Sequence, residues 1–484
     1  MYRKRNQTKM KKNFKKLALF GVLLIMIFGS LLCKVEVSMA GMEASRLAVV
    51  EAVADQGVFH IENTHFKTVD KIIRNNHIYS DKPVTLSWCA AQFCKVVKLL
   101  SGKNFSNSYN FMIYLMGMVF GAAVNALCFY WLFRYLCRTA KGDMRLKLMF
   151  ALLCCCGTWL FSYMTIFSNH VPSALAVTGV MVCLDKYRRK QDMRAAAWAG
   201  FASGALFTLD LVAGAVFLAA SPVSVWLTAP KEKRFSAAFR CAASGACIVL
   251  FSLSLNHAAY GTVLPLYMVS GGTFTPGTND KQHLMYLLET LFTYRGLFSY
   301  QPLLLLVFPA VYCLRRKLRA NDIVMLLAAA ATTAIYVTIT NEFGGFAYGY
   351  RYLVSIIPLL MYYTAKFVLD SKSVRLTLFA AVLGVIGLVP AFVGAYEPMC
   401  VAFEGYRSPQ GHFTRTIRST FMSNLLAWSY ETAPDSYLTR KLIERYGKND
   451  SFRYLRAQYI ITKHIGTLEK LLKDSRFDLT KPVK

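Results

Sequence analysis

The chain has 484 residues, of which 55% are hydrophobic and 17% are charged, and its mean hydropathy is +0.37. A soluble chain of this length would carry about 25% charged residues, and many apolar runs here approach the roughly 20 residues that cross a bilayer as a helix. The composition excludes an ordinary soluble protein and predicts an all-α polytopic membrane protein.

The net charge of +30 comes from 56 Lys and Arg against 26 Asp and Glu. In a soluble protein such an excess would suggest nucleic-acid binding. No basic patch with interleaved aromatic residues lies on a soluble segment, and in a membrane protein Lys and Arg mark the loops that stay in the cytoplasm. Nucleic acid is therefore excluded as a partner.

Residues 1–16 carry eight Lys and Arg and precede an apolar run from Leu17 to about Cys33. The pattern resembles a signal peptide, but the run is long and no small-residue cleavage site follows it closely. We interpret residues 17–39 as an uncleaved first span with the basic segment 1–16 in the cytoplasm. The 13 Cys show no ligand spacing of a zinc site, so no metal ligand is assigned.

A polar loop at 41–107 follows the first span. Residues 43–56 have apolar positions at helical spacing, 58–62 alternates as a short extended piece, and Asn75-Asn76 predicts a turn. Pro83 suits the first position of a helix over 84–100. That helix carries Lys95 and Lys98, so we interpret it as an interfacial helix lying on the membrane.

With 84–100 on the membrane surface, ten further spans follow and every basic cluster falls on the cytoplasmic side. If 84–100 were instead a true span, the topology of every later span would be inverted. The richest Lys and Arg clusters would then lie outside, so this alternative is rejected. Including the first, the sequence predicts about 11 transmembrane helices, the others being 109–133, 148–167, 171–185, 195–209, 211–229, 236–255, 298–314, 322–340, 352–369 and 375–395.

The last segment, 397–484, is less apolar than the spans. Residues 438–446 and 468–472 have a helical pattern, and 459–462 has the pattern of a short strand. The segment predicts a small mixed region on the extracytoplasmic side, which either forms a domain or lies on the membrane as a cap.

Ionisable groups near the outer ends of the spans are the candidate site, because such groups are costly inside hydrocarbon and usually functional there. A carboxylate can accept a proton from a hydroxyl nucleophile, and Lys or Arg can bind a phosphate leaving group. The alternative is a solvated loop with incidental charges. The candidates in the first loop are Glu43, Arg46, Asp70, Lys71, Asp81 and Lys82.

Further candidates come from later loops. His170 follows Asn169 at the tip of an apolar hairpin, and Asp210 stands between two apolar spans, where it needs a partner or water. Arg295 lies among aromatic residues, and Tyr350 and Arg351 close a Gly- and Tyr-rich string. The alternatives are a polar hairpin tip, a turn residue and an interfacial aromatic belt with snorkelling Arg.

Several classes of chemistry lack their motifs. The sequence has no phosphate-binding P-loop, no GxSxG and no HExxH. Transporters often carry polar breaks near mid-membrane, whereas the polar groups here gather at the outer ends. This distribution favours catalysis at the outer surface. A lipid-linked saccharide flippase or transporter without catalysis is the alternative.

At these residues the chain resembles membrane glycosyltransferases of the C-type fold (GT-C, glycosyltransferase family 39-like), among them the polyprenyl-phosphate-mannose protein mannosyltransferases and the aminoarabinose–lipid A transferase. Glu43-Ala-Ser-Arg46-Leu-Ala resembles an acidic-x-x-Arg-Tyr-Ala segment, and Asp81-Lys82-Pro83 resembles an acidic-Lys-Pro-Pro segment. Residues 294–302 and 345–353 resemble strings of other members. The resemblance covers residues 1–396, predicted as the transmembrane domain from residue 17, and leaves 397–484 uncovered.

The resemblance implies an inverting transfer of a sugar from a polyprenyl-phosphate carrier to an acceptor hydroxyl of a protein, lipid or glycan, outside the cytoplasmic (inner) membrane. Glu43 would activate the acceptor, with Asp81 as a second catalytic carboxylate, and Lys82 would bind the carrier phosphate. Glu43 replaces the usual Asp, and Asn169-His170 stands where relatives often have an acidic residue. The resemblance therefore leaves open whether a divalent metal takes part.

Overall fold

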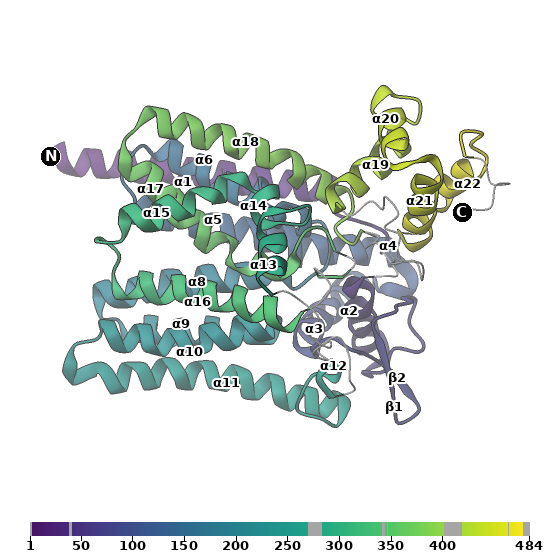
Figure 1. The fold of residues 1–484 in the computed structure, drawn as a ribbon. Helices are drawn as coiled ribbons and strands as arrows, with labels where there is room; N and C mark the ends of the chain where they lie inside the picture. The colour runs from purple at the N-terminus through teal and green to yellow at the C-terminus, as the bar shows by residue number, and fades with distance from the viewer. Residues whose placement is uncertain are drawn as a thin grey trace.

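The computed structural model describes residues 2–37, 41–269, 283–340, 344–345, 347–400, 419–462 and 464–477. In these residues almost all regular structure is helical, as the sequence predicts. The long helices lie side by side in one bundle, and a smaller group of short helices and a hairpin covers one of its ends (Figure 1).

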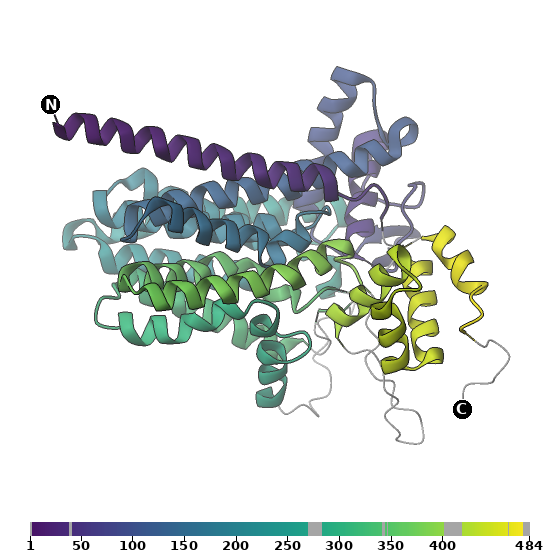
Figure 2. The ribbon, with the colours of Figure 1, turned by 90° about the horizontal axis from the view of Figure 1, so that it is seen from above.

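The bundle is built from long apolar helices. Its members are α1 (Tyr2–Leu32), α4 (Phe105–Met116), which continues through η2 (Gly117–Ala122) into α5 (Ala123–Thr139), α6 (Met144–Cys156), α8 (His170–Lys190), α9 (Met193–Leu209), α10 (Leu211–Thr228), α11 (Arg234–Tyr260) after η3 (Lys231–Lys233), α16 (Ala320–Ile339), α17 (Ile357–Ser371) after η5 (Arg351–Ile356), and α18 (Val374–Tyr396). Seen from above, α1 runs along the outside of the others (Figure 2).

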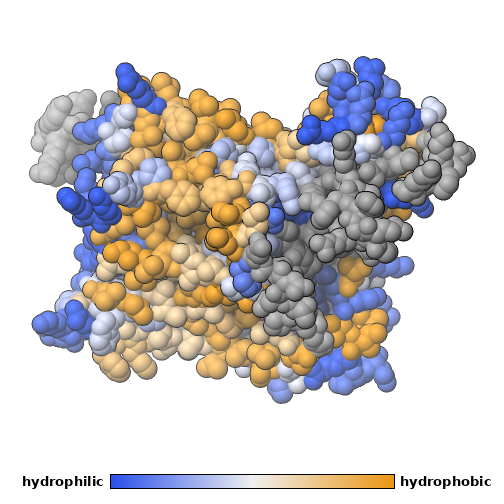
Figure 3. Space-filling view, viewed as in Figure 1, coloured by the Kyte–Doolittle hydropathy of each residue, from blue (hydrophilic) through white to orange (hydrophobic). Residues whose placement is uncertain are grey.

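The two ends of the bundle differ in charge. The N-terminus and the links from α8 to α9 and from α10 to α11 lie at the left of Figure 1, and we call this the basic end. The opposite end carries the segment 41–107 and is called the loop end. An apolar surface spans the bundle between more hydrophilic ends (Figure 3). This arrangement agrees with the prediction that the basic clusters share one side.

Seven described helices are long and apolar enough to cross a membrane, or up to eight if a bent pair forms one span. The chain is thus a multi-pass membrane protein by the length and composition of its helices. The predicted number of about 11 counts shorter or more charged helices, such as α6, α8 and α9, and stays a prediction.

Two predicted spans are not continuous helices. The segment 148–167 breaks at Gly157, after which Thr158 caps the short α7 (Trp159–Tyr163) through the Leu160 N–H. The segment 298–314 breaks at Pro302, which has no N–H to continue a helix. A bend of 106° there separates α13 (His283–Phe292) and α14 (Leu297–Tyr300) from η4 (Pro302–Leu306) and α15 (Val307–Leu314).

The loop end is formed by α2 (Met42–Glu51), η1 (Ala52–Gln56), the hairpin β1 (Lys71–Arg74) and β2 (His77–Ser80), α3 (Val84–Ser101) and α12 (Leu266–Val269). The predicted helix at 43–56 is confirmed. The predicted turn is confirmed too, because Asn75 and Asn76 both have positive φ and join the antiparallel strands. The segment 58–62, predicted as a short extended piece, forms no β-strand, and its Ile61 N–H donates to the Ile78 carbonyl of the hairpin at 2.8 Å.

Helix α3 begins after Pro83, which is its N-cap residue rather than its first helical position. One face of α3 packs on α2 and α11, and the other leaves Val96, Leu99 and Leu100 exposed. An amphipathic helix of this kind is consistent with the predicted interfacial position. Its contact with a membrane stays a prediction.

The regular structure in the described part of the last segment is all helical, where the sequence predicted a mixed region. Its helices are α19 (Thr420–Thr432), α20 (Tyr437–Tyr446), α21 (Lys448–Thr462) and α22 (Ile465–Leu472). The predicted strand at 459–462 is the last turn of α21. Tyr459 is fully buried and its hydroxyl donates to the Ala427 carbonyl at 3.1 Å, so packing against α19 overrides the strand propensity.

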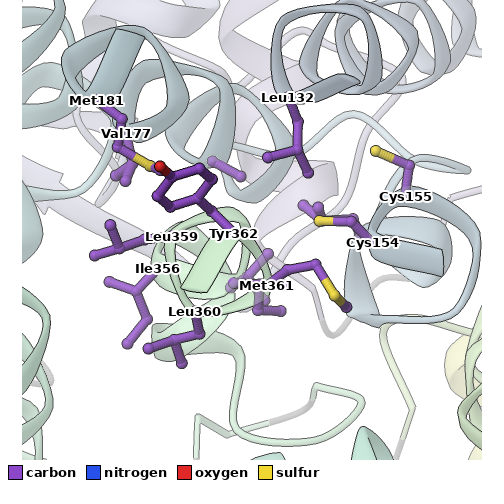
Figure 4. Close-up of a cluster of buried hydrophobic side chains, with 14 of the residues drawn as sticks. Leu132, Cys154, Cys155, Val177, Met181, Ile356, Leu359, Leu360, Met361 and Tyr362 are labelled. Atoms are coloured by element: carbon purple, nitrogen blue, oxygen red, sulfur yellow. The ribbon is translucent and has the colours of Figure 1, made fainter. Parts of the chain in front are cut away.

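The bundle interior is filled with buried apolar side chains. The run Cys154-Cys155-Cys156 is buried as free thiols, which agrees with its prediction as a hydrophobic segment. Figure 4 shows part of this core, formed by Leu132 of α5, Cys154 and Cys155 of α6, Val177 and Met181 of α8, Ile356 of η5, and Leu359, Leu360, Met361 and Tyr362 of α17.

The packing of α9 against α11 predicts a specific sensitivity. A Cβ on Gly200 would lie 1.9 Å from the carbonyl oxygen of Cys241, which is backbone and has no rotamer to change. We expect Gly200→Ala to cost roughly 1–3 kcal/mol by overpacking and to lower the melting temperature in detergent. Gly179→Ala is the control, because its Cβ would lie 3.5 Å from its nearest neighbour, Ala202 Cβ. Equal melting temperatures for the two variants would contradict this close approach.

Candidate functional site

A cavity of about 110 Å³ lies at the loop end of the bundle. Five of the predicted site residues line it: Arg46, Lys82, His170, Asp210 and Arg351. They come from α2, the link before α3, the start of α8, the link between α9 and α10, and η5. The fold thus brings together residues that lie up to about 300 positions apart in the sequence. Charged residues of an ordinary solvated loop would not gather in this way.

Arg46 is the cation most enclosed by the protein among those lining the cavity. Its side chain is 3% exposed, and its Nη1 donates to the Pro83 carbonyl at a long 3.4 Å. Its Nε–H has no acceptor among the described residues. Burial lowers the pKa of Arg46 to about 10, which nearby Asp81 opposes, so the guanidinium stays charged at neutral pH. A buried charged donor without an acceptor is costly, and an anion in the cavity would satisfy it.

Lys82 is held at the cavity by two carboxylates. Its Nζ lies 2.9 Å from Asp70 Oδ2 and 2.9 Å from Asp81 Oδ2. Asp70 and Asp81 do not line the cavity, but they contact a residue that does. Burial raises the pKa of Asp81, which Lys82 opposes, and Asp81 Oδ1 has no partner among the described residues. The ion pairs fix where the ammonium group points.

Ser45 of α2 holds the ends of the β1–β2 hairpin against this helix. Its hydroxyl donates to the Asp70 carbonyl at 2.6 Å and shares a hydrogen bond of 2.7 Å with the Ser80 hydroxyl. The Ser80 hydroxyl also accepts the Lys82 N–H at 3.1 Å. One turn of α2 therefore presents Arg46 to the cavity while the preceding residue anchors the segment that carries Lys82.

Glu43 lies beside the cavity, although it is absent from its lining. It sits on α2 between Met42 and Arg46, which do line the cavity, and its Oε1 accepts the Phe167 N–H at 2.9 Å. Burial raises the pKa of Glu43 to about 8, with an upward contribution from Glu397 and opposition from the Phe167 N–H and Lys34. The carboxyl is therefore mostly protonated at pH 7.

Asp210 and His170 form the opposite wall. Asp210 caps α10: its Oδ1 accepts the Ala213 N–H at 3.1 Å and the Tyr336 hydroxyl, so the predicted need for a partner is confirmed. His170 begins α8, with its ring centroid 4.6 Å from that of Tyr163. Its Nε2 has no partner among the described residues. A single orphaned ring nitrogen next to a cavity is available to a ligand.

Three predicted site residues lie elsewhere. Lys71 is exposed on β1, and Tyr350 is buried with its hydroxyl 2.9 Å from the Thr340 hydroxyl. Arg295 is buried, and its Nη1 contacts the Gly345 carbonyl at 3.5 Å. Arg295 does not line this cavity, and its predicted part in a phosphate site stays a prediction.

Sequence reasoning missed three tyrosines of the lining, Tyr267, Tyr336 and Tyr352. The rings of Tyr336 and Tyr352 stack with centroids 4.6 Å apart. Tyr352 belongs to the Gly- and Tyr-rich string that was singled out, so a signal was present. Tyr336 sits inside an apolar span, and only its contact with Asp210 reveals its part in the site.

A larger cavity of about 450 Å³ lies at the basic end, between the ends of α5, α8 and α17 and the start of α16. Asp185 lines it and is separated from His170 by about 22 Å along α8, at 1.5 Å per residue. Asp185 pairs with Arg188 and Arg189, and Asp370 pairs with Lys366. These pairs neutralise three of the six Lys and Arg side chains that line this larger cavity, whereas the Arg46 Nε–H has no acceptor among the described residues.

Comparison with known proteins defines the class of fold. The structure of ArnT from Cupriavidus metallidurans, bound to undecaprenyl phosphate, matches with a TM-score of 0.52 at 13% identity, over 94% of this chain and 76% of that chain. The apo structure of the Archaeoglobus fulgidus oligosaccharyltransferase matches with a TM-score of 0.46 at 11% identity. It covers 89% of this chain, which spans about three fifths (59%) of that protein.

No protein-family model and no curated protein matches the sequence. The chain has the fold of the GT-C membrane glycosyltransferases, which confirms the predicted resemblance at the level of fold. The assignment of the fold rests on the match to the ArnT structure, with its TM-score of 0.52.

The buried Glu43 predicts a pH-dependent stability. Its folded pKa is raised from 4.5 to about 8, so the folded state binds the proton more tightly than the unfolded chain. This contributes stability that is complete below pH 4.5 and is lost as the pH rises through 8. We expect the melting temperature of the wild type to fall relative to Glu43→Gln between pH 5 and pH 8.5, by roughly 5 °C or more.

The matched control is Glu444→Gln on α20, whose carboxylate is 60% exposed. It should follow the wild type across the same pH range in a fluorescence melting assay. A constant difference between the wild type and Glu43→Gln at all pH values would show that Glu43 does not titrate in this window.

Proposed function

We propose that the protein transfers a sugar from a polyprenyl-phosphate carrier to an acceptor hydroxyl, with inversion at the sugar. The observation that carries the proposal is Arg46, a buried cation in a cavity at the end of a membrane bundle, whose Nε–H lacks an acceptor in the part of the chain that the structure describes. A carrier phosphate at the membrane surface supplies that acceptor, and its apolar chain remains in the lipid.

The cavity suits a phosphate leaving group. Arg46, Lys82 and Arg351 bring three cations to its lining, and fixed positive charges in a water-poor site offset charge that develops on a leaving phosphate. Arg binds phosphate through directed N–H groups, whereas Lys acts as a compact charge. The ion pairs of Lys82 with Asp70 and Asp81 hold that charge in place before the carrier enters.

The transfer itself is a displacement at the anomeric carbon. The acceptor oxygen forms a bond to this carbon, the bond to the phosphate oxygen breaks, and the acceptor proton passes to a carboxylate. We assign this proton to Glu43, because it lies beside the cavity and is buried. Asp81, whose Oδ1 has no partner among the residues that the structure describes, is the second catalytic carboxylate. Tyr267, Tyr352 and His170 supply walls for a sugar.

The proposed setting is the outer face of the cytoplasmic membrane. Support comes from the charge asymmetry of the bundle, since Lys and Arg clusters mark cytoplasmic ends and the cavity lies at the other end. The N-terminus would then be cytoplasmic, and the helices α19 to α22 would lie outside.

Carrier binding tests the cation assignment. With purified protein and undecaprenyl phosphate, we expect Lys82→Met to weaken binding by roughly 10- to 100-fold, since a hydrogen bond between charged groups contributes about 1.5–3 kcal/mol. Lys71→Met is the matched control, because the same substitution eleven residues earlier removes an exposed lysine. Native mass spectrometry or surface plasmon resonance measures both. Equal losses in the two variants would reject the assigned phosphate site.

Transfer tests the base. Mass spectrometry of cell-envelope glycans should show one added sugar with the wild type, and a loss of at least about 100-fold in Glu43→Gln, which is the usual range for a general base. The variant should still bind the carrier.

Once the product is known, the wild-type rate should rise with pH towards about 8, where Glu43 loses its proton. Carrier binding without any transferred sugar would favour the flippase instead.

A further inference from the structure

Among the described residues, one group of three potential metal-binding side chains has its ligand atoms within 4.8 Å of one another: His60, Glu62 and His77. His60 Nδ1 lies 2.7 Å from Glu62 Oε2, and His77 Nδ1 lies 3.0 Å from Glu62 Oε1. The two imidazole rings stack with centroids 4.5 Å apart and planes 19° apart. Two histidines from different segments therefore each direct their Nδ1 atom to the carboxylate of Glu62.

The donor set is that of a transition metal. Two imidazole nitrogens and one carboxylate are ligands that suit Zn²⁺, whereas Mg²⁺ and Ca²⁺ take oxygen ligands. Tetrahedral zinc with bonds of about 2.0–2.1 Å separates its ligand atoms by about 3.3 Å. The observed distances from the two Nδ1 atoms to the Glu62 oxygens, 2.7 and 3.0 Å, are slightly shorter. The side chains therefore need to move apart only a little to admit the ion.

The carboxylate is also oriented by a neighbour. Glu62 Oε1 accepts the Ile78 N–H at 2.7 Å, so strand β2 fixes the carboxylate as well as supplying His77. Hydrogen bonds of this kind hold the ligands of natural metal sites in place. All three side chains keep solvent access, with exposed fractions of 27%, 25% and 49% for His60, Glu62 and His77. An ion can therefore reach the group from water.

We propose that His60, Glu62 and His77 form a zinc site that ties residues 60–62 to the start of β2. The site is separate from the cavity that holds Lys82 and Arg46, since none of its residues lines that cavity. A water completes the four-coordinate shell, and the ion clamps the hairpin whose second strand runs directly into Asp81 and Lys82. The proposal goes beyond the proposed transfer and does not depend on it.

Zinc binding to the full-length protein in detergent tests the proposal. After treatment with a chelator, the protein should bind one Zn²⁺ per chain in isothermal titration calorimetry, and Zn²⁺ should raise its melting temperature. Mg²⁺ and Ca²⁺ at the same concentration should do neither. Co²⁺ should give the visible absorption of a site with nitrogen and oxygen ligands. A wild-type protein that binds no Zn²⁺ overturns the proposal.

Variants locate the ion. His77→Ala and Glu62→Gln should abolish both zinc binding and the cobalt absorption. The matched control is His65→Ala, because His65 lies in the same loop and also contacts a carboxylate, Glu51, at 2.5 Å, but belongs to a separate pair. Melting without added metal shows that each variant folds. If His77→Ala still binds one Zn²⁺, or if His65→Ala loses it, the assigned ligands are wrong.

Discussion

Ionisable side chains are costly in hydrocarbon, and this constraint determines where chemistry can occur in the molecule. The middle of the bundle is filled with apolar side chains and thiols, and the polar cavities lie at its two ends. At the basic end, carboxylates already neutralise several of the cations. At the loop end, Arg46 remains charged, buried and incompletely bonded. Arg46 is therefore a buried cation whose Nε–H has no acceptor among the described residues, and an anion in the cavity would supply one.

The same constraint made part of the fold predictable. Clusters of Lys and Arg indicated which ends lie together, and the turn at Asn75-Asn76 followed from side chains that tolerate positive φ. The break at Gly157 was missed because Thr158 caps a new helix inside an apolar run. The strand predicted at 459–462 failed because Tyr459 is buried against α19, a contact that local pattern does not record.

The site was predictable in its chemistry but less so in its membership. Arg46 and Lys82 were found as charged residues of the first outer loop, and His170, Asp210 and Arg351 as polar residues between apolar spans. The fold brings all five to one cavity. Arg295 shares that pattern, yet it is directed to Gly345. Tyr336 is the converse case, since a tyrosine inside a span gives no signal until its hydroxyl meets Asp210. Long-range packing decides between such residues.

The hairpin β1–β2 connects the two polar features of the loop end. At its base, Ser45 binds the Asp70 carbonyl and the Ser80 hydroxyl, which sets the register of the hairpin against the helix that carries Arg46. Farther along, Glu62 holds His77 and the Ile78 N–H. Asp81 lies four positions after His77, which is about 13 Å of extended chain at 3.3 Å per residue. Because a strand paired along one edge bends little, a clamp at His77 restricts where Lys82 can lie. The distance between Lys82 and Arg46, and hence the size of anion they can share, depends on both ends of this short strand.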